Sequence, residues 1–244
     1  MFILLVVYSL FTTTSCKEIF TNASSDIVLD SIVISLQTSM LVVLMTLVIG
    51  FPVAYLLALK RFPFREIISS LVELPIVLPP LIAGVGLLIL LGNNGLVGRI
   101  FGFFDYRVLF TKMGIIIAQF FVASPFFIKS VKDAIESIPK ELFEMADTMG
   151  ASSFEKTIYI ILPMIRPSIV SGLIISWSRA LGEFGATAMV AGSIPGTTET
   201  MTLAIYSNSM NGQISSATSI AMILVIFSFF LIAFIKKTNV KIEI

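Results

Sequence analysis

Long uninterrupted runs of apolar residues dominate the chain, and short polar segments separate them. A bilayer core about 30 Å thick requires about 20 apolar residues in a helix. The runs do not alternate between apolar and polar residues as the strands of a membrane barrel do. The pattern therefore predicts an all-α membrane protein, a polytopic helical bundle, whose five clear spans are 31–59, 67–91, 113–131, 167–190 and 215–235.

The N-terminal segment 1–15 is apolar but short for a membrane span. A secretory signal begins with positive charge, whereas no charge precedes Lys17, and the stretch before Cys16 lacks the apolar residue that begins a lipoprotein cleavage box. We expect a retained short first helix, with a signal-like segment as the alternative. The prediction is a single transmembrane domain over 1–244 with six spans, or five if this segment is removed.

Composition supports a membrane protein and excludes several chemistries. Hydrophobic residues make up 57% of the chain and charged residues 13%, against roughly 45–50% and about 25% in soluble domains. The chain has no histidine, and Cys16 is its only cysteine, which excludes histidine catalysis, histidine metal sites and an internal disulfide. It has no G-x-x-x-x-G-K-[ST] motif. We therefore expect no catalytic residue, metal or cofactor, and no nucleic-acid binding, with any ATP hydrolysed by a separate polypeptide.

Basic residues fall unevenly on the two sides of the predicted spans. Only four face the side of the first loop, namely Lys17, Arg99, Arg107 and Lys112. Because cytoplasmic loops carry the excess of Lys and Arg, the polar segment 132–162 and the C-terminus are expected in the cytoplasm. Eleven basic residues carry this prediction: Lys60, Arg61, Arg65, Lys129, Lys132, Lys140, Lys156, Arg166, Lys236, Lys237 and Lys241.

The polar segment 132–162 is predicted to form two helices. Pro139 suits a first helical turn and Gly150 the residue just past a helix end, while Ser152 and Glu155 form a capping-box pair that begins a second helix. An amphipathic loop on the membrane surface is the alternative, but such a loop is rich in Lys and Arg, and this one mixes them with acids. A protein partner is favoured, and the expected apolar face comprises Ile135, Ile138, Leu142, Met145, Ala146 and Met149.

The same segment resembles the EAA loop of ABC-importer permease subunits. The matching residues are Glu144, Ala146, Gly150, Ile160, Leu162 and Pro163, with Met145 in place of the usual second alanine. The resemblance implies a type I ABC importer permease fold, in which this loop inserts into a groove on the nucleotide-binding subunit. It also implies a homodimer with two ATPase subunits and an extracytoplasmic oxyanion-binding protein, in the plasma membrane of a bacterium or archaeon.

Two further stretches resemble the molybdate permeases, which are close to the tungstate and sulfate permeases. One is E-L-P-I-V-L-P-P at 73–80, and the other begins R-A-L-G-E-F-G-A-T at 179–187 and continues to Thr200. The resemblance implies import of molybdate or tungstate by alternating access, with selectivity mainly in the binding protein. A sulfate or thiosulfate ABC permease is the alternative.

Prolines and charges inside the spans indicate a translocation pathway or gate. Pro75, Pro79 and Pro80 cannot all occupy a regular helix, and irregular backbone at membrane depth occurs where it is packed in protein or lines a cavity. Arg179 and Glu183 are four residues apart within the predicted fifth span, where charges usually face the bundle interior. They are candidates for the pathway or gate, or for a purely structural ion pair. Glu73 is expected to be a helix-terminus or interface residue.

An ion-coupled secondary transporter is the alternative from another functional class. It would show inverted repeats and ionisable residues in several spans, whereas only Arg179 and Glu183 lie deep here and no repeat is evident. On the side opposite to the polar segment, the turn-rich loops 92–95 and 192–200 are expected docking surfaces for the binding protein.

Overall fold

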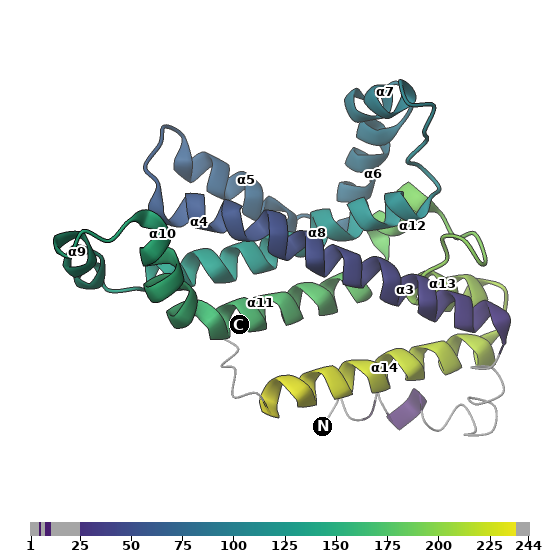
Figure 1. Ribbon diagram of the computed structural model, residues 1–244. Helices are drawn as coiled ribbons and strands as arrows, with labels where there is room; N and C mark the ends of the chain where they lie inside the picture. The colour runs from purple at the N-terminus through teal and green to yellow at the C-terminus, as the bar shows by residue number, and fades with distance from the viewer. Residues whose placement is uncertain (1–4, 6–7, 11–24, 238–244) are drawn as a thin grey trace.

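The computed structural model describes residues 5, 8–10 and 25–237, and every regular element in this part of the chain is helical. Most of the predicted first helix, 1–15, lies outside the described residues. The long helices run side by side along one axis (Figure 1). The elements before the polar segment are α3 (Asp26–Met45), the π-helical turn η1 (Thr46–Gly50), α4 (Phe51–Leu59), α5 (Arg65–Val77), α6 (Pro80–Leu91), α7 (Leu96–Gly102) and α8 (Lys112–Glu136).

The second half of the chain begins with the exposed helix α9, which projects from the left end of the bundle in Figure 1. The central helix of the bundle is α8, because it contacts α3, α4, α5, α11 and α12. The remaining elements are α9 (Lys140–Thr148), α10 (Ser153–Lys156), the π-helical turn η2 (Thr157–Ile161), α11 (Leu162–Leu181), α12 (Gly185–Ala191), α13 (Met201–Met210) and α14 (Ile214–Lys237).

Three predicted spans are confirmed as helices. The first, 31–59, lies within a continuous helical rod of 34 residues, Asp26–Leu59. The spans 113–131 and 215–235 lie within α8 and α14. Among the described residues, three helices are long and apolar enough to cross a membrane, a bent pair adds a fourth, and α14 has a shorter apolar part, Ile214–Phe230.

The predicted span 67–91 is not one straight helix. It consists of α5 and α6, which meet at an angle of 116°. Leu78 is extended, as residues before proline usually are, and neither Pro79 nor Pro80 has an N–H to continue the hydrogen bonds of α5. Pro75 lies inside α5, so the break belongs to the later two prolines. As a result, α6 and α7 project sideways from the bundle (Figure 1).

The predicted span 167–190 is also wrong in its limits. The helix begins at Ser153, runs through η2 and α11, and ends at Leu181. A non-helical step at 182–184 separates it from α12. The polar return segment and the fifth span are therefore one continuous helix.

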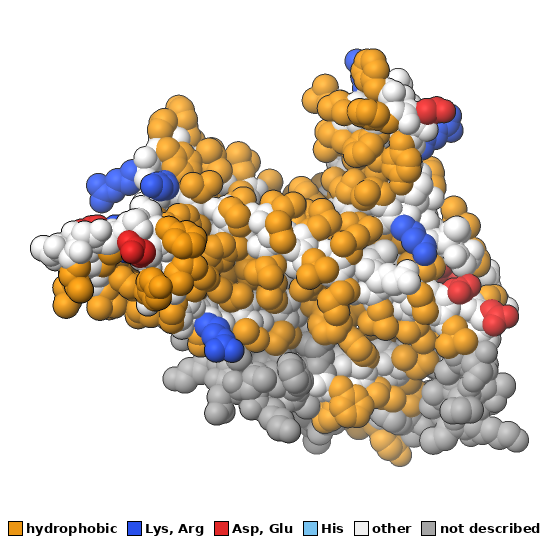
Figure 2. Space-filling model, in the orientation of Figure 1, with side chains coloured by type: hydrophobic (Ala, Val, Ile, Leu, Met, Phe, Trp, Pro, Cys, Tyr) orange, Lys and Arg blue, Asp and Glu red, His pale blue; other side chains and the backbone are white. Residues whose placement is uncertain are grey.

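Two of the five buried clusters among the described residues bear on the predicted sites. The first, which we call the coupling-end core, lies nearest to α9 and comprises Ala54, Leu57, Phe127, Ile128, Val131, Ile135, Ile138, Ile161 and Ile165. The second joins α6, α8 and α12, where small residues permit close approach, since a Cβ on Gly84 would lie 2.9 Å from Ala186 Cα. Elsewhere large apolar side chains cover the outer surface (Figure 2), as expected for lipid-facing helices.

Candidate coupling surface and translocation elements

The exposed helix α9 begins after a break that the apolar periodicity did not indicate. The predicted helix from Ile135 to Met149 is divided, because α8 ends at Glu136 and α9 begins at Lys140. Pro139 precedes α9 in an extended conformation instead of occupying its first turn. Since proline lacks an N–H and disfavours a helical residue before it, the chain changes direction here, and α9 is free to turn away from α8.

Gly150 ends α9 with a tight turn, as predicted. Its φ is +76°, a conformation that favours glycine. The Ala151 N–H donates to the Ala146 carbonyl at 2.9 Å, and the Gly150 N–H donates to the Asp147 carbonyl at 3.0 Å. These two bonds are the Schellman arrangement, which satisfies the free carbonyls at a helix end.

The return helix begins with the predicted capping box. The Ser152 N–H donates to Glu155 Oε2 at 2.7 Å, and the Glu155 N–H donates to Ser152 Oγ at 3.3 Å. Across the turn, Lys156 Nζ lies 2.6 Å from Asp147 Oδ1. The caps at both helix ends and the salt bridge between Lys156 and Asp147 make this a rigid helix–turn–helix. Such a unit can transmit a displacement without deforming.

The turn carries an exposed apolar surface on a polar segment. Met145, Met149 and Phe154 are 62%, 85% and 73% exposed, and we call these three side chains the coupling tip. Leu142 and Phe143, on the same helix, pack against the coupling-end core instead. Exposed apolar groups of this kind mark interaction sites, so α9 is anchored on one face and presents the other to a partner.

The residues of the EAA resemblance divide between these two roles. Glu144 and Met145 are exposed, so the larger Met145 side chain is accommodated where an alanine is usual, whereas Ala146 is buried beneath the tip. Ile160 packs against the coupling-end core, and Leu162 and Pro163 begin α11. The first half of the motif therefore forms the surface and the second half anchors the return helix.

Arg179 and Glu183 lie close together, but not on one continuous helix. Arg179 is in the last turn of α11, whereas Glu183 follows its end. Their closest atoms, Arg179 Nη2 and Glu183 Oε2, are 3.6 Å apart, and the Glu183 side chain is only 1% exposed. Glu183 Oε1 accepts from the Ala186 N–H at 2.9 Å, and Thr202 Oγ1 donates to the Glu183 carbonyl at 2.8 Å. Glu183 thus holds the step between α11 and α12.

The two segments that carry the predicted pathway residues abut each other. A Cβ on Gly185 would lie 3.1 Å from Pro80 Cβ and 3.1 Å from the Leu81 nitrogen. The N-termini of α6 and α12 therefore meet, and α6 packs along α12. Pro79 and Pro80 are thus brought next to the segment that Glu183 caps, which the separation of about a hundred residues along the chain could not indicate.

A network of charges between α5 and α8 was not predicted as a unit. Glu73 Oε1 lies 3.2 Å from Lys132 Nζ, and Glu73 Oε2 lies 3.7 Å from Lys129 Nζ. Lys132 Nζ also donates to Ser69 Oγ at 2.8 Å. Glu73 is therefore a residue of the helix interface, as expected, but no local pattern identifies lysines 56 and 59 positions later as its partners.

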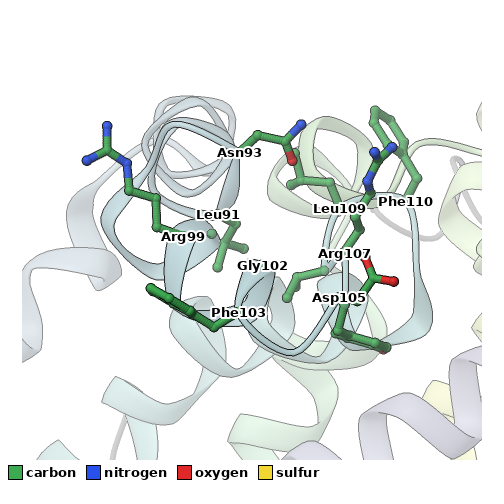
Figure 3. Close-up of a pocket in the computed structure, with 12 residues that line it drawn as sticks. Leu91, Asn93, Arg99, Gly102, Phe103, Asp105, Arg107, Leu109 and Phe110 are labelled. Carbon is green, nitrogen blue, oxygen red and sulfur yellow. The ribbon is translucent and has the colours of Figure 1, made fainter.

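A cavity of about 700 Å³ lies far from α9, beside α7 (Figure 3). Arg107 and Asp105 lie on one side of it, while Arg99 points outward on the other. Asn93 is its only lining residue from the predicted docking loops, and no predicted coupling or pathway residue lines it. In the other predicted docking loop, residues 193–197 are exposed but 198–200 are buried, so only part of that loop is available to a partner.

Comparison with known families identifies the chain. Residues 47–240 match the model of the binding-protein-dependent transport system inner membrane component. The chain belongs to this family. Its members are non-catalytic, multi-pass components of the inner or plasma membrane, and ABC permeases associate with ATPase subunits and periplasmic binding proteins.

Several relatives are 34–42% identical to the chain over the part that aligns. The "Probable transport system permease protein NifC" of Clostridium pasteurianum is 42% identical over 84% of this chain and 72% of its own. The molybdenum transport system permease protein ModB of Haemophilus influenzae is 34% identical over 73% and 79%. The sulfate transport system permease protein CysT of Escherichia coli is 34% identical over 76% and 67%.

Solved structures support the same fold. A bacterial ABC transporter that imports the polysaccharide alginate is similar with a TM-score of 0.71, at 21% identity over 94% of this chain and 85% of its own. The MetNI methionine ABC transporter in an inward-facing conformation is similar with a TM-score of 0.68, at 19% identity over 87% and 94%. The predicted fold of an ABC importer permease is confirmed.

Proposed function

We propose that the chain is the permease of an ATP-driven importer that moves molybdate or tungstate into the cytoplasm by alternating access. The observation that carries the proposal is the coupling tip, Met145, Met149 and Phe154, presented on a rigid helix–turn–helix. In this proposal the tip occupies a groove on the ATPase and faces the cytoplasm, as the basic residues around it suggest.

The rigid return helix gives the proposal its mechanism. ATP binding closes two ATPase subunits and draws the two coupling tips of a permease dimer together. Because α10, η2 and α11 form one continuous helix, that movement reaches the step at Glu183 and opens the pathway outward. Hydrolysis then returns the dimer inward. The energy enters as the difference in ATPase affinity for the two states.

The oxyanion assignment rests on the relatives and on the 179–187 stretch. ModB and CysT are described as permeases for molybdenum and sulfate. Molybdate, tungstate and sulfate are all tetrahedral dianions. Because Glu183 lies within 3.6 Å of Arg179, this arginine is partly neutralised and makes a weak anion site. A permissive pathway follows, with selectivity in the extracytoplasmic binding protein. A sulfate or thiosulfate permease is the second candidate, favoured by the CysT relatives.

A homodimer is part of the proposal. The outward face of α5 carries Ile67, Leu71 and Leu74, which are 57%, 61% and 49% exposed. Together with the laterally projecting α6, it borders a concave notch on the molecule (Figure 2). A second copy packed into this notch would enclose the two non-helical steps. Non-helical backbone at membrane depth must be buried in protein or line a cavity, so this packing would satisfy that requirement.

Reconstitution tests both the mechanism and the substrate. The chain is placed in proteoliposomes with the ATPase and the binding protein encoded beside it, and uptake of molybdate, tungstate and sulfate is measured by mass spectrometry of the metal or sulfur. We expect ATP-dependent uptake of molybdate that tungstate competes with, and no uptake when the P-loop lysine of the ATPase is replaced. Uptake that persists with the inactive ATPase refutes the importer, and preferential uptake of sulfate selects the second candidate.

A further inference from the structure

The ring of Phe127 is enclosed between two glycines on different helices. Phe127 is fully buried in the central helix α8. A Cβ on Gly50, the last residue of η1, would lie 3.0 Å from Phe127 Cδ1, and a Cβ on Gly172 of α11 would lie 3.1 Å from Phe127 Cδ2. Both flanking helices therefore contact opposite edges of the ring with bare backbone, and a methyl group on either side would have to displace it.

Both flanking helices contain a π-helical turn that ends two residues before a proline. Pro52 follows η1 and Pro163 follows η2, each as the second residue of the next helix. Each proline leaves the carbonyl four residues earlier, at Val48 and Tyr159, without its usual donor and crowds it with the ring. Widening of the helix at these positions relieves that contact, and such turns frequently occur at functional sites. The proline of the EAA resemblance is thus the origin of one turn.

The helix that follows the first π-helical turn, α4, contacts the second π-helical turn, η2, beside the exposed helix α9. The hydroxyl groups of Tyr55 in α4 and Thr157 in η2 lie 3.2 Å apart. Ala54 and Leu57 of α4 belong to the same buried cluster as Ile161 and Phe127. We therefore expect a displacement of α10 to move α4 and α11 together. Both helices pack in the same buried cluster as Phe127.

We propose that Phe127 is a pivot on which these two helices tilt when the coupling tip moves, and that Gly50 and Gly172 are positioning residues that leave the ring room to turn. The π-helical turns allow each helix to bend locally, and the ring of Phe127, which contacts both helices, makes them tilt together. The proposal rests on the proposed importer function and adds to it the place where the movement is converted into helix tilt.

Substitution of Gly172 by alanine tests the pivot in the reconstituted complex with ATPase and binding protein. We expect molybdate uptake per ATP hydrolysed to fall about tenfold, equivalent to ~1.4 kcal/mol, together with loss of the stimulation of ATPase activity by the loaded binding protein. Gly172→Ala combined with Phe127→Val should recover part of the coupling, because valine has no atom at the Cδ2 position that the added methyl group meets. Gly102→Ala, at the end of α7, is the matched control, since no atom lies within 4 Å of its added Cβ.

The outcomes separate the pivot from the importer function. If the wild-type complex shows no ATP-dependent uptake, the proposed function fails. If the wild-type complex transports and Gly172→Ala couples normally, the pivot is wrong. Should Gly172→Ala fail to assemble, Phe127→Leu alone decides: we expect raised ATPase activity without binding protein and fewer molecules imported per ATP, and an unchanged ratio overturns the proposal.

Discussion

Gly150 offers the sharpest test of the coupling surface, because space and backbone conformation can be separated there. Its φ is +76°, and a Cβ added at this position would meet no atom within 4 Å. A substitution therefore produces no clash inside the chain. For an L-residue the left-handed conformation costs about 1–2 kcal/mol, and β-branched residues are especially poor in it, whereas asparagine is tolerated. Valine and asparagine are of similar size, so comparing them separates this backbone cost from the effect of added bulk.

The chain can avoid the strain only by unwinding the end of α9. That would break the two hydrogen bonds from Ala151 and Gly150, each worth about 0.5–1.5 kcal/mol. Unwinding therefore costs about as much free energy as keeping the strained conformation. With a penalty of about 1–2 kcal/mol, the competent form of the tip falls by a factor of about 5–30. We expect Gly150→Val to weaken ATPase binding and coupled transport by about this factor, and Gly150→Asn by much less.

The assay is titration of the purified ATPase against the permease in lipid nanodiscs, with molybdate uptake measured in parallel. Membrane insertion and dimerisation should be unchanged in both variants, because Gly150 is exposed and a Cβ added there meets no atom within 4 Å. Wild-type affinity and turnover in Gly150→Val would refute the reasoning. Equal losses in the valine and asparagine variants would show that added bulk in the ATPase groove, not the backbone conformation, causes the defect.

Three further predictions concern single contacts. Met149→Glu should abolish ATPase binding without lowering the melting temperature, because the side chain is 85% exposed; a stable variant that still binds ATPase would contradict the tip. Glu183→Ala should destabilise by at least about 1 kcal/mol, since the Ala186 N–H loses its acceptor and Arg179 loses its ion-pair partner, whereas Glu183→Gln should retain the cap; thermal unfolding in detergent compares them, and equal melting temperatures would refute the cap. Lys132→Met should cost about 1 kcal/mol of stability, because the partly exposed Glu73 carboxylate loses the nearer of its two lysines but keeps Lys129 and Ser69, and Lys132→Arg should cost less; the same unfolding measurement tests this, and no difference would argue against the network.

Local signals in the sequence were sufficient for part of the coupling surface. The turn at Gly150 and the capping box at Ser152 and Glu155 were predicted because each closes hydrogen bonds within about five residues. The break at Pro79 and Pro80 was also foreseeable, since proline lacks a donor wherever it stands. Its angle of 116° was not, because that depends on how α6 packs along α12.

Contacts between distant segments were decided only by the tertiary structure. Phe127 lies between Gly50 and Gly172, and Lys132 faces Glu73, and no spacing along the chain brings these partners together. The limits of the fifth span were wrong for a related reason, since the apolar run continues across the step at 182–184.

The apolar sequence by itself determined that the chain forms membrane helices, and roughly where most of them lie. It did not determine which face of each helix is buried in protein. Val42 is fully buried and Val48 is 70% exposed in the same helical rod, yet the two residues are chemically identical. In water hydrophobicity distinguishes core from surface, but lipid accepts apolar side chains as readily as protein does. Only packing between helices therefore decides which residues form the core, the steps and the coupling surface.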